Sequence, residues 1–276
     1  MQLYGHYTDL NGLLGIISNK ELWATNIRYL NDSKEFDHAY ELLKVLFKET
    51  VFTDDVPAVP QKQFRNFFSE MTTQMARQYH RSFNSYSISF SKKTDLLSQW
   101  RGYCKPNDAI CVVFDIDELF KSINDSVLAQ CLTLNKCIYE HREQLQAVNN
   151  VVNEHFNEKN SAKKQILIET ICEGFFELAL FCKHDSFAEE EELRICYESL
   201  SPRDDTRITF RTGNGFLVPY AKIPFDLKSI QKIVIGPNSN RELSYNSIRF
   251  LLDKEFKTNT LCTGFPIEHT ETPFRV

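Results

Sequence analysis

Four polar clusters in this sequence contain residue types that carry acid–base and ligand-binding chemistry. They are His6-Tyr7-Thr8, Ser89-Phe90-Ser91, Gln99–Tyr103 and Glu189–Arg194. Carboxylates, hydroxyls and an imidazole can together bind a polar ligand, move a proton or stabilise a developing positive charge. Each cluster falls at the end of an expected strand or in an adjoining turn. We therefore predict that side chains from separate elements converge there on one small-molecule site.

The acidic run is the most informative of these clusters. On a strand, Glu190, Glu192 and Arg194 would project to one face, while Glu191 and Leu193 would project to the other. Two neighbouring carboxylates repel, so one of them should have a raised pKa or be held by a cation such as Arg194. Such a carboxylate can bind two ribose hydroxyls and stabilise positive charge at a sugar carbon. The alternative is a solvated acidic loop without a site.

The other clusters also allow two interpretations. His6 is either a site residue or a structural histidine with satisfied hydrogen bonds. Trp100 is expected in the core, while Arg101 and Tyr103 can line a pocket. Cys182-Lys183-His184 offers two metal ligands but has no second close pair, so no metal site is expected. The sequence has no Walker A loop, G-x-G-x-x-G, H-E-x-x-H or G-x-S-x-G motif, which weakens common nucleotide-hydrolase and serine-hydrolase interpretations.

The elements that must position these clusters are strands and helices in irregular order. Alternating or continuous apolar runs bounded by turn residues indicate strands, and apolar residues at helical spacing indicate helices. Because strict β-α alternation is absent, we expect an α+β fold. Thr8 or Asp9, and Thr94 or Asp95, are expected helix caps. Short extended segments are expected to end at His6-Tyr7 and to span Leu22–Thr25, and further strands are expected near 86–91, 109–114, 131–139, 192–197, 216–220, 230–235 and 260–263. Helices are expected near 10–17, 34–50, 61–81, 95–103, 241–256 and over most of 117–182.

Composition limits the class of protein. The 276 residues allow one large domain or two small ones, and a net charge of −5 argues against electrostatic coating of nucleic acid, although a local basic groove stays possible. No apolar run reaches the roughly 18–20 residues of a membrane helix, and no signal peptide is evident. The eight cysteines contain no C-x-x-C pair. We expect a reduced, cytoplasmic protein without membrane association.

Further short motifs occur in a fixed order along the chain. They are His6-Tyr7-Thr8, Leu13–Ile16, Leu22–Thr25, Tyr29–Phe36, Ser89–Ser91, Asp95–Tyr103, Lys183-His184 with Phe187, Glu190 and Glu192–Arg194, then Pro219-Tyr220 and Ile233–Pro237. This ordered set, which covers most of the chain, resembles a bacterial family of unknown function that is often met near phage-defence and mobile-element genes. That family is in turn distantly similar to ADP-ribosyltransferases of the diphtheria-toxin, poly-ADP-ribose-polymerase and DarT-like kinds.

The resemblance implies a single ADP-ribosyltransferase-like domain over residues 1–276. Its core would be a split mixed β-sheet, with helical insertions near 34–82 and 117–182. NAD would be the substrate. His6 would hold a ribose, Ser91 or Tyr103 would face the nicotinamide, and Glu190 or Glu192 would be the catalytic carboxylate, with Arg194 orienting it or touching a phosphate. Tyr7, Thr8 and Arg101 complete the NAD-binding residues that we expect.

The implied activity is NAD-dependent ADP-ribosyl transfer to a macromolecule, with RNA or DNA preferred to protein as the acceptor. Such an enzyme would be a toxin or an anti-phage effector, restrained by an antitoxin or another inhibitory partner. An NAD glycohydrolase, or an inactive nucleotide-sensing or protein-binding module, are the alternatives. Aromatic and basic residues in Phe64–Arg81 can stack on and neutralise nucleic acid, or can form an ordinary amphipathic helix.

Overall fold

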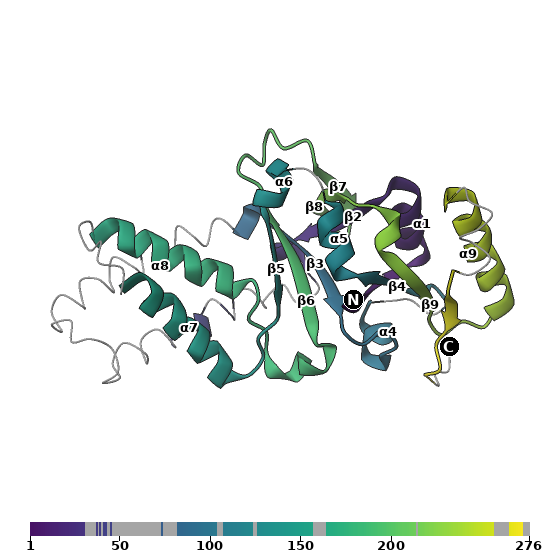
Figure 1. The fold of residues 1–276 in the computed structure, drawn as a ribbon, viewed down its shortest axis with the longest axis horizontal. Coiled ribbons are helices and arrows are strands. Elements are labelled where there is room, and N and C mark those ends of the chain that lie inside the picture. The colour runs from purple at the N-terminus through teal and green to yellow at the C-terminus, as the bar shows by residue number, and fades with distance from the viewer. Residues whose placement is uncertain are drawn as a thin grey trace.

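A computed structural model gives the fold of the chain (Figure 1). It describes residues 1–30, 82–103, 107–123, 126–156, 164–213, 215–256 and 265–272, with isolated helical positions at 37, 39, 41, 42, 45 and 73. Apart from those positions, the expected helices near 34–50 and 61–81, including Phe64–Arg81, lie outside the described residues. The strand expected near 260–263 lies outside them as well.

The strands of the described residues form a ten-stranded sheet, and among them every pairing is antiparallel except that of β9 with β10, so the fold is α+β. The order is β10-β9-β4-β1-β3-β2-β8-β7, and β6 pairs with both β3 and β5. The strands are β1 (Leu3–Asp9), β2 (Glu21–Asn26), β3 (Ser85–Ser91), β4 (Ala109–Asp115), β5 (Leu132–Lys136), β6 (Glu192–Glu198), β7 (Ile208–Thr212), β8 (Leu217–Pro224), β9 (Ile230–Ile235) and β10 (Ile267–His269).

The sheet divides at β3. One edge of β3 pairs with β6 along its whole length. The other edge pairs with β1 only at Ser91 and with β2 only at Tyr86 and Ser87. Between those two contacts, β1 and β2 diverge from the same edge. Within β3, Ser89 lies at this split and is the strand's single half-buried residue, all others being buried.

The helices cover both faces of the sheet and extend beyond it. Figure 1 shows α7 and α8 side by side at one end of the molecule and α9 at the other end. The helices are α1 (Leu10–Asn19), α4 (Leu97–Tyr103), α5 (Ile116–Ser122), α6 (Ser126–Gln130), α7 (His141–Phe156), α8 (Lys164–Ala179) and α9 (Arg241–Phe256), with short 3₁₀ segments η1 (Ile27–Tyr29), η2 (Ser82–Asn84), η3 (Asp185–Glu190) and η4 (Leu227–Ser229).

Helix α1 follows directly from its local sequence. Asp9 is the N-cap, and its Oδ1 accepts the N–H of Gly12 at 2.7 Å. A Cβ on Gly12 would clash with Oγ1 of Thr8, so a larger residue here would force the Thr8 side chain to move. The helix ends where Lys20 adopts a left-handed conformation, with φ of 56°, and donates its N–H to the carbonyl of Ile16. The expected cap at Thr8 or Asp9 is therefore Asp9.

Strand alternation separates an apolar face from a more polar face. Phe90 of β3 and Leu193 of β6 lie opposite each other and belong to the main core, which α1, α5 and α9 complete. On the other face, α7 and α8 pack around buried Phe175 and Phe176, and α4 packs over β1, β4 and β9 through Trp100. The polar clusters between these packed regions carry the candidate site.

The strand expected near 131–139 is β5, which extends the sheet by pairing with β6. Two details differ from the sequence-based expectations. Strand β7 was not anticipated, since its Thr- and Arg-containing sequence lacks an apolar run. Glu190 lies in η3 rather than on a strand, and Glu191 has a left-handed backbone with φ of 42°, so β6 begins only at Glu192.

Candidate functional site

The acidic run is positioned by the turn from η3 into β6. Glu189 and Glu191 are exposed, whereas Glu190 and Glu192 are buried. Exposed Glu191 pairs with Lys93 at 2.8 Å, with both side chains about half exposed. The solvated-loop interpretation therefore applies to only two of the four glutamates. Glu192 and Arg194 share a strand face, as alternation predicted, whereas Glu190 joins them from η3 through its contact with Lys183.

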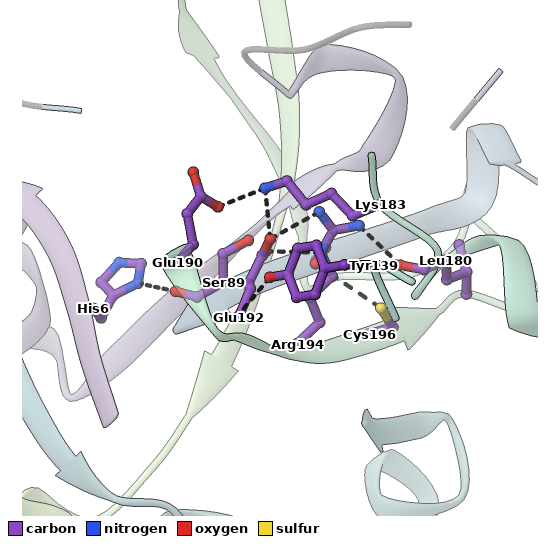
Figure 2. A network of polar contacts seen from close by, with 10 residues as sticks. His6, Ser89, Tyr139, Leu180, Lys183, Glu190, Glu192, Arg194 and Cys196 are labelled. Atoms are coloured by element: carbon purple, nitrogen blue, oxygen red, sulfur yellow. Dashed lines mark hydrogen bonds and ion pairs between the residues drawn. The ribbon is translucent and has the colours of Figure 1, made fainter. Parts of the chain in front are cut away.

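Two cations hold the two buried carboxylates (Figure 2). Lys183 Nζ lies 2.6 Å from Glu190 Oε2 and 2.7 Å from Glu192 Oε2, and it is almost fully buried. Arg194 Nε donates to Glu192 Oε1 at 2.7 Å, and another guanidinium N–H reaches Glu192 Oε2 at 3.1 Å. The formal charges of these four residues, which we call the Lys183 network, cancel.

The network controls the ionisation of Glu192. Burial by itself would raise the pKa of this carboxyl, but the charges of Arg194 and Lys183 outweigh it and lower the pKa to about 2. Of the two outcomes expected for adjacent carboxylates, the structure shows the one in which a cation holds the negative charge. Glu192 therefore stays ionised at neutral pH.

Backbone pairing outside the regular sheet holds Lys183 in place. The main chain of Ile138 accepts the N–H of Lys183 and donates to the carbonyl of Phe181. Gln144 on α7 donates its side-chain amide to the carbonyls of Ile138 and Lys183. Arg194 adds a hydrogen bond to the carbonyl of Leu180 at 2.8 Å. These bonds hold the segment between α8 and η3 beside β6. The Lys183 side chain is thereby directed at the two carboxylates.

His6 lies at the split in the sheet. Its Nδ1 is 2.9 Å from the carbonyl of Ser89, which must accept a hydrogen, so Nδ1 carries the proton. Burial lowers the pKa of His6 below its ordinary value, and the bond to Ser89 only partly opposes this. The ring is therefore neutral at pH 7, and its Nε2 is an acceptor. Such an acceptor can receive a hydrogen bond from a hydroxyl group of a ligand.

His6 and the Lys183 network project to opposite faces around the split. Gly5 pairs with Ser91, and Ser91 pairs with Glu192, so these three residues share a face. His6 lies on the other face, with its ring centroid 5.7 Å from that of Phe90. Figure 2 shows His6 to one side of the network, bonded to the carbonyl of Ser89, which is the strand partner of Arg194. A ligand would have to enter the split to contact both.

Ser91 and Tyr7 have structural partners. Ser91 Oγ donates to the carbonyl of Glu190 at 2.7 Å and accepts the N–H of Lys93, which fastens η3 to the end of β3. Tyr7 Oη donates to the carbonyl of Lys93 and accepts the N–H of Leu96. The structure thus brings Ser91 to the acidic cluster, where its hydroxyl bonds the backbone, and it places Tyr7 under the turn that follows β3.

The α4 residues lie further out. Trp100 is buried, as expected, and packs edge-on against Tyr7 with 4.6 Å between ring centroids. Arg101 and Tyr103 are exposed on the outer side of this short helix. Thr8 is half-buried beside Gly12 at the start of α1. That Arg101, Tyr103 and Thr8 share one cleft with Glu190 stays a prediction.

Lys183 is the network residue that sequence reasoning missed. The sequence placed it in a possible metal motif and in the family resemblance, without a role in either chemistry. A usable signal existed, because a buried carboxylate pair needs more than one cation and Lys183 lies seven residues before Glu190. Among the described residues, no three His, Cys, Asp or Glu side chains are grouped to hold a metal ion.

Residues 99–195 match a family described as "Protein of unknown function (DUF2971)". The matched stretch runs from α4 to β6 and includes the whole Lys183 network, but it does not include His6 or Ser91. No curated protein and no solved structure matches the chain. In the part of the chain that the structure describes, no helix is long and apolar enough to span a bilayer.

Proposed function

We propose that this protein binds NAD at the split in the sheet and transfers ADP-ribose from it to a macromolecular acceptor, as in an ADP-ribosyltransferase-like fold. The observation that carries the proposal is the divergence of β1 and β2 from one edge of β3, with His6 bonded to Ser89 at that point and the Lys183 network beside it. A split edge exposes both faces of a sheet to one ligand, which an unbroken pairing cannot do.

The residues present suit the chemistry of NAD. The bond from the ribose C1′ to nicotinamide breaks, nicotinamide leaves with the bonding electrons, and the ribose carbon becomes positively charged. An acceptor oxygen or nitrogen then bonds to that carbon and loses its proton. The Nε2 atom of neutral His6 would accept a hydrogen bond from a ribose hydroxyl group. A carboxylate of the network would accept hydrogen bonds from other ribose hydroxyl groups and stabilise the positive charge on the ribose carbon.

Glu190 is the carboxylate that we assign to the ribose. Its side chain is 11% exposed, against 5% for Glu192, so it is the more accessible of the two carboxylates to a ligand. Glu192 would then act as a positioning residue, because it holds Lys183 and Arg194 in place. Lys183 would restrain Glu190 until a ligand arrives.

The test measures nicotinamide release from NAD by chromatography, with purified protein and with added cell extract. Wild type should release nicotinamide, and Glu190→Gln should be slower by roughly a hundredfold to a thousandfold, since it loses one electrostatic interaction in the transition state. Glu191→Gln is the matched control, because Glu191 is the exposed neighbour paired with Lys93. Unchanged turnover in Glu190→Gln would remove this carboxylate from the mechanism.

The acceptor is tested with NAD labelled in its adenine ring. Label appearing in nucleic acid or protein of the extract supports transfer, while free ADP-ribose alone indicates an NAD glycohydrolase that uses water. We also propose that the active protein arrests growth and needs an inhibitory partner. Equal, unimpaired growth of cells that express wild type or a His6→Ala, Glu190→Gln variant would count against the toxin role.

A specific observation favours a second function, that of a nucleotide-sensing module without catalysis. Both oxygens of Glu192 are bonded to cations inside the protein, and Glu190 is held by the same lysine. Carboxylates neutralised in this way stabilise a fold but offer less charge to a reacting sugar. Saturable binding of NAD by calorimetry, with no nicotinamide released by wild type, would select this function.

A further inference from the structure

An exposed cluster of aromatic and arginine side chains lies beyond the end of β2. Three rings from three separate segments are solvent-exposed here: Tyr29 of η1, Phe83 of η2 and Phe216 before β8. The Tyr29 and Phe216 rings are 5.9 Å apart. Arg28 lies over the Phe83 ring, 5.4 Å from its centroid. We call these four residues together with Arg211 the Tyr29 surface.

Contacts between the segments make this surface continuous. Arg28 and Tyr29 are neighbours in the chain and contact the two flanking rings. Asn26 donates its side-chain amide to the carbonyl of Phe83 at 2.8 Å, which ties η2 to the end of β2. Arg211 on β7 donates to Oγ1 of Thr25 at 3.2 Å, which brings the hairpin of β7 and β8 to the same place. Figure 1 shows this hairpin beside β2.

The charge of this region differs from that of the whole chain. The Tyr29 surface includes two arginines, Arg28 and Arg211, whereas the chain carries a net charge of −5. Arg28 forms an ion pair with Asp37. Exposed Arg211 has a hydroxyl partner but, within the described residues, no carboxylate partner. Its positive charge is therefore available to an anionic ligand beside the exposed rings.

We infer that the Tyr29 surface binds single-stranded nucleic acid. Exposed rings provide stacking faces for unpaired bases, and arginines next to them neutralise the phosphates that join those bases. The surface also leads to the candidate site. Thr25, which holds Arg211, pairs with Ser87, and Ser87 is two strand residues, or about 7 Å, from Ser89 at the split. Binding of nucleic acid is independent of the proposed function. The inference rests on that function only in making the bound nucleic acid the acceptor of ADP-ribose.

The experiment uses the full-length protein and fluorescein-labelled RNA and DNA of about 12 nucleotides, single-stranded or as duplexes, in anisotropy titrations without NAD. Single strands should bind saturably and more tightly than duplexes, and binding should weaken between 50 and 200 mM salt. Phe216→Ala or Tyr29→Ala should weaken it by about fivefold or more, as expected for the loss of one stacked base. Arg211→Gln should reduce the dependence on salt.

Phe250→Ala is the control, because Phe250 is an exposed ring on α9 outside the Tyr29 surface. Its affinity should match that of wild type, and thermal melting should show every variant folded. No saturable binding, as expected if the surface docks a protein, would overturn the inference. Equal effects of Phe216→Ala and Phe250→Ala, or equal affinity for duplexes, would overturn it as well. Binding and nicotinamide release are separate readouts, so failure of either proposal is distinguishable from failure of the other.

Discussion

Removing Lys183 is the sharpest perturbation of the buried network. In Lys183→Met, Glu190 and Glu192 would remain buried and would lose the lysine that they share, while Arg194 would still pair with Glu192. Breaking a buried ion pair by removing one partner typically costs about 3–5 kcal/mol, because a charge is left uncompensated. We expect the free energy of unfolding at pH 7, measured by urea titration with circular dichroism, to fall by that amount.

The pH dependence gives an independent measure of the same interaction. The pKa of Glu192 is about 2 in the folded protein, against an ordinary value of 4.5. The network therefore contributes stability that is fully present above pH 4.5 and is lost as the pH falls towards 2, about 3 kcal/mol in total. Without Lys183, one of the charges that lower this pKa is missing. The difference between variant and wild type should therefore shrink as the solution is acidified.

Two further variants make this prediction specific. Lys93→Met removes the lysine of an exposed pair with Glu191 and should change stability by less than about 1 kcal/mol. The double variant Lys183→Met, Glu190→Gln removes one charge of each sign and should be more stable than Lys183→Met alone. A loss below about 1 kcal/mol in Lys183→Met, or a loss that does not vary with pH, would refute the view that this lysine compensates the carboxylates.

Other regions give predictions of the same kind. Gly5→Ala would place a methyl group against Cys111 Sγ and should cost roughly 1–3 kcal/mol, and Cys111→Ala in the same chain should recover part of this loss in urea titrations. The Asp95 carboxylate accepts hydrogen bonds from Trp100 Nε1, Thr272 Oγ1 and the N–H of Glu271, and Asp95→Asn weakens this acceptor. Limited proteolysis should therefore cut the C-terminal segment faster in the variant than in wild type. Equal rates of cleavage would exclude this attachment. Burial raises the pKa of Cys182 and Cys196 to about 12, so both thiols should react with iodoacetamide at pH 8 far more slowly in the folded protein than in urea, as peptide mass spectrometry would measure.

Local sequence determined much of the fold and part of the site. The apolar spacing after Asp9 predicted α1, the continuous run 109–114 predicted β4, and the period of 241–256 predicted α9. In the acidic run, strand alternation put Glu192 and Arg194 on one face, whereas Glu190 lies in η3 and reaches them from outside the strand. These features depend on residues within a few positions of one another, which is the range over which helical and strand periods act.

Tertiary structure decided what those residues contact. Lys183 reaches the carboxylates because the segment after α8 is held by Ile138 and Gln144, residues about 40 positions earlier in the chain. The split at β3 arises from pairings between residues at least 60 positions apart, and no local pattern encodes which edges meet. Burial then set the charge state of Glu192 and the neutral ring of His6, because the free energy of an ion depends on the solvent and charges that surround it and not on its neighbours in sequence.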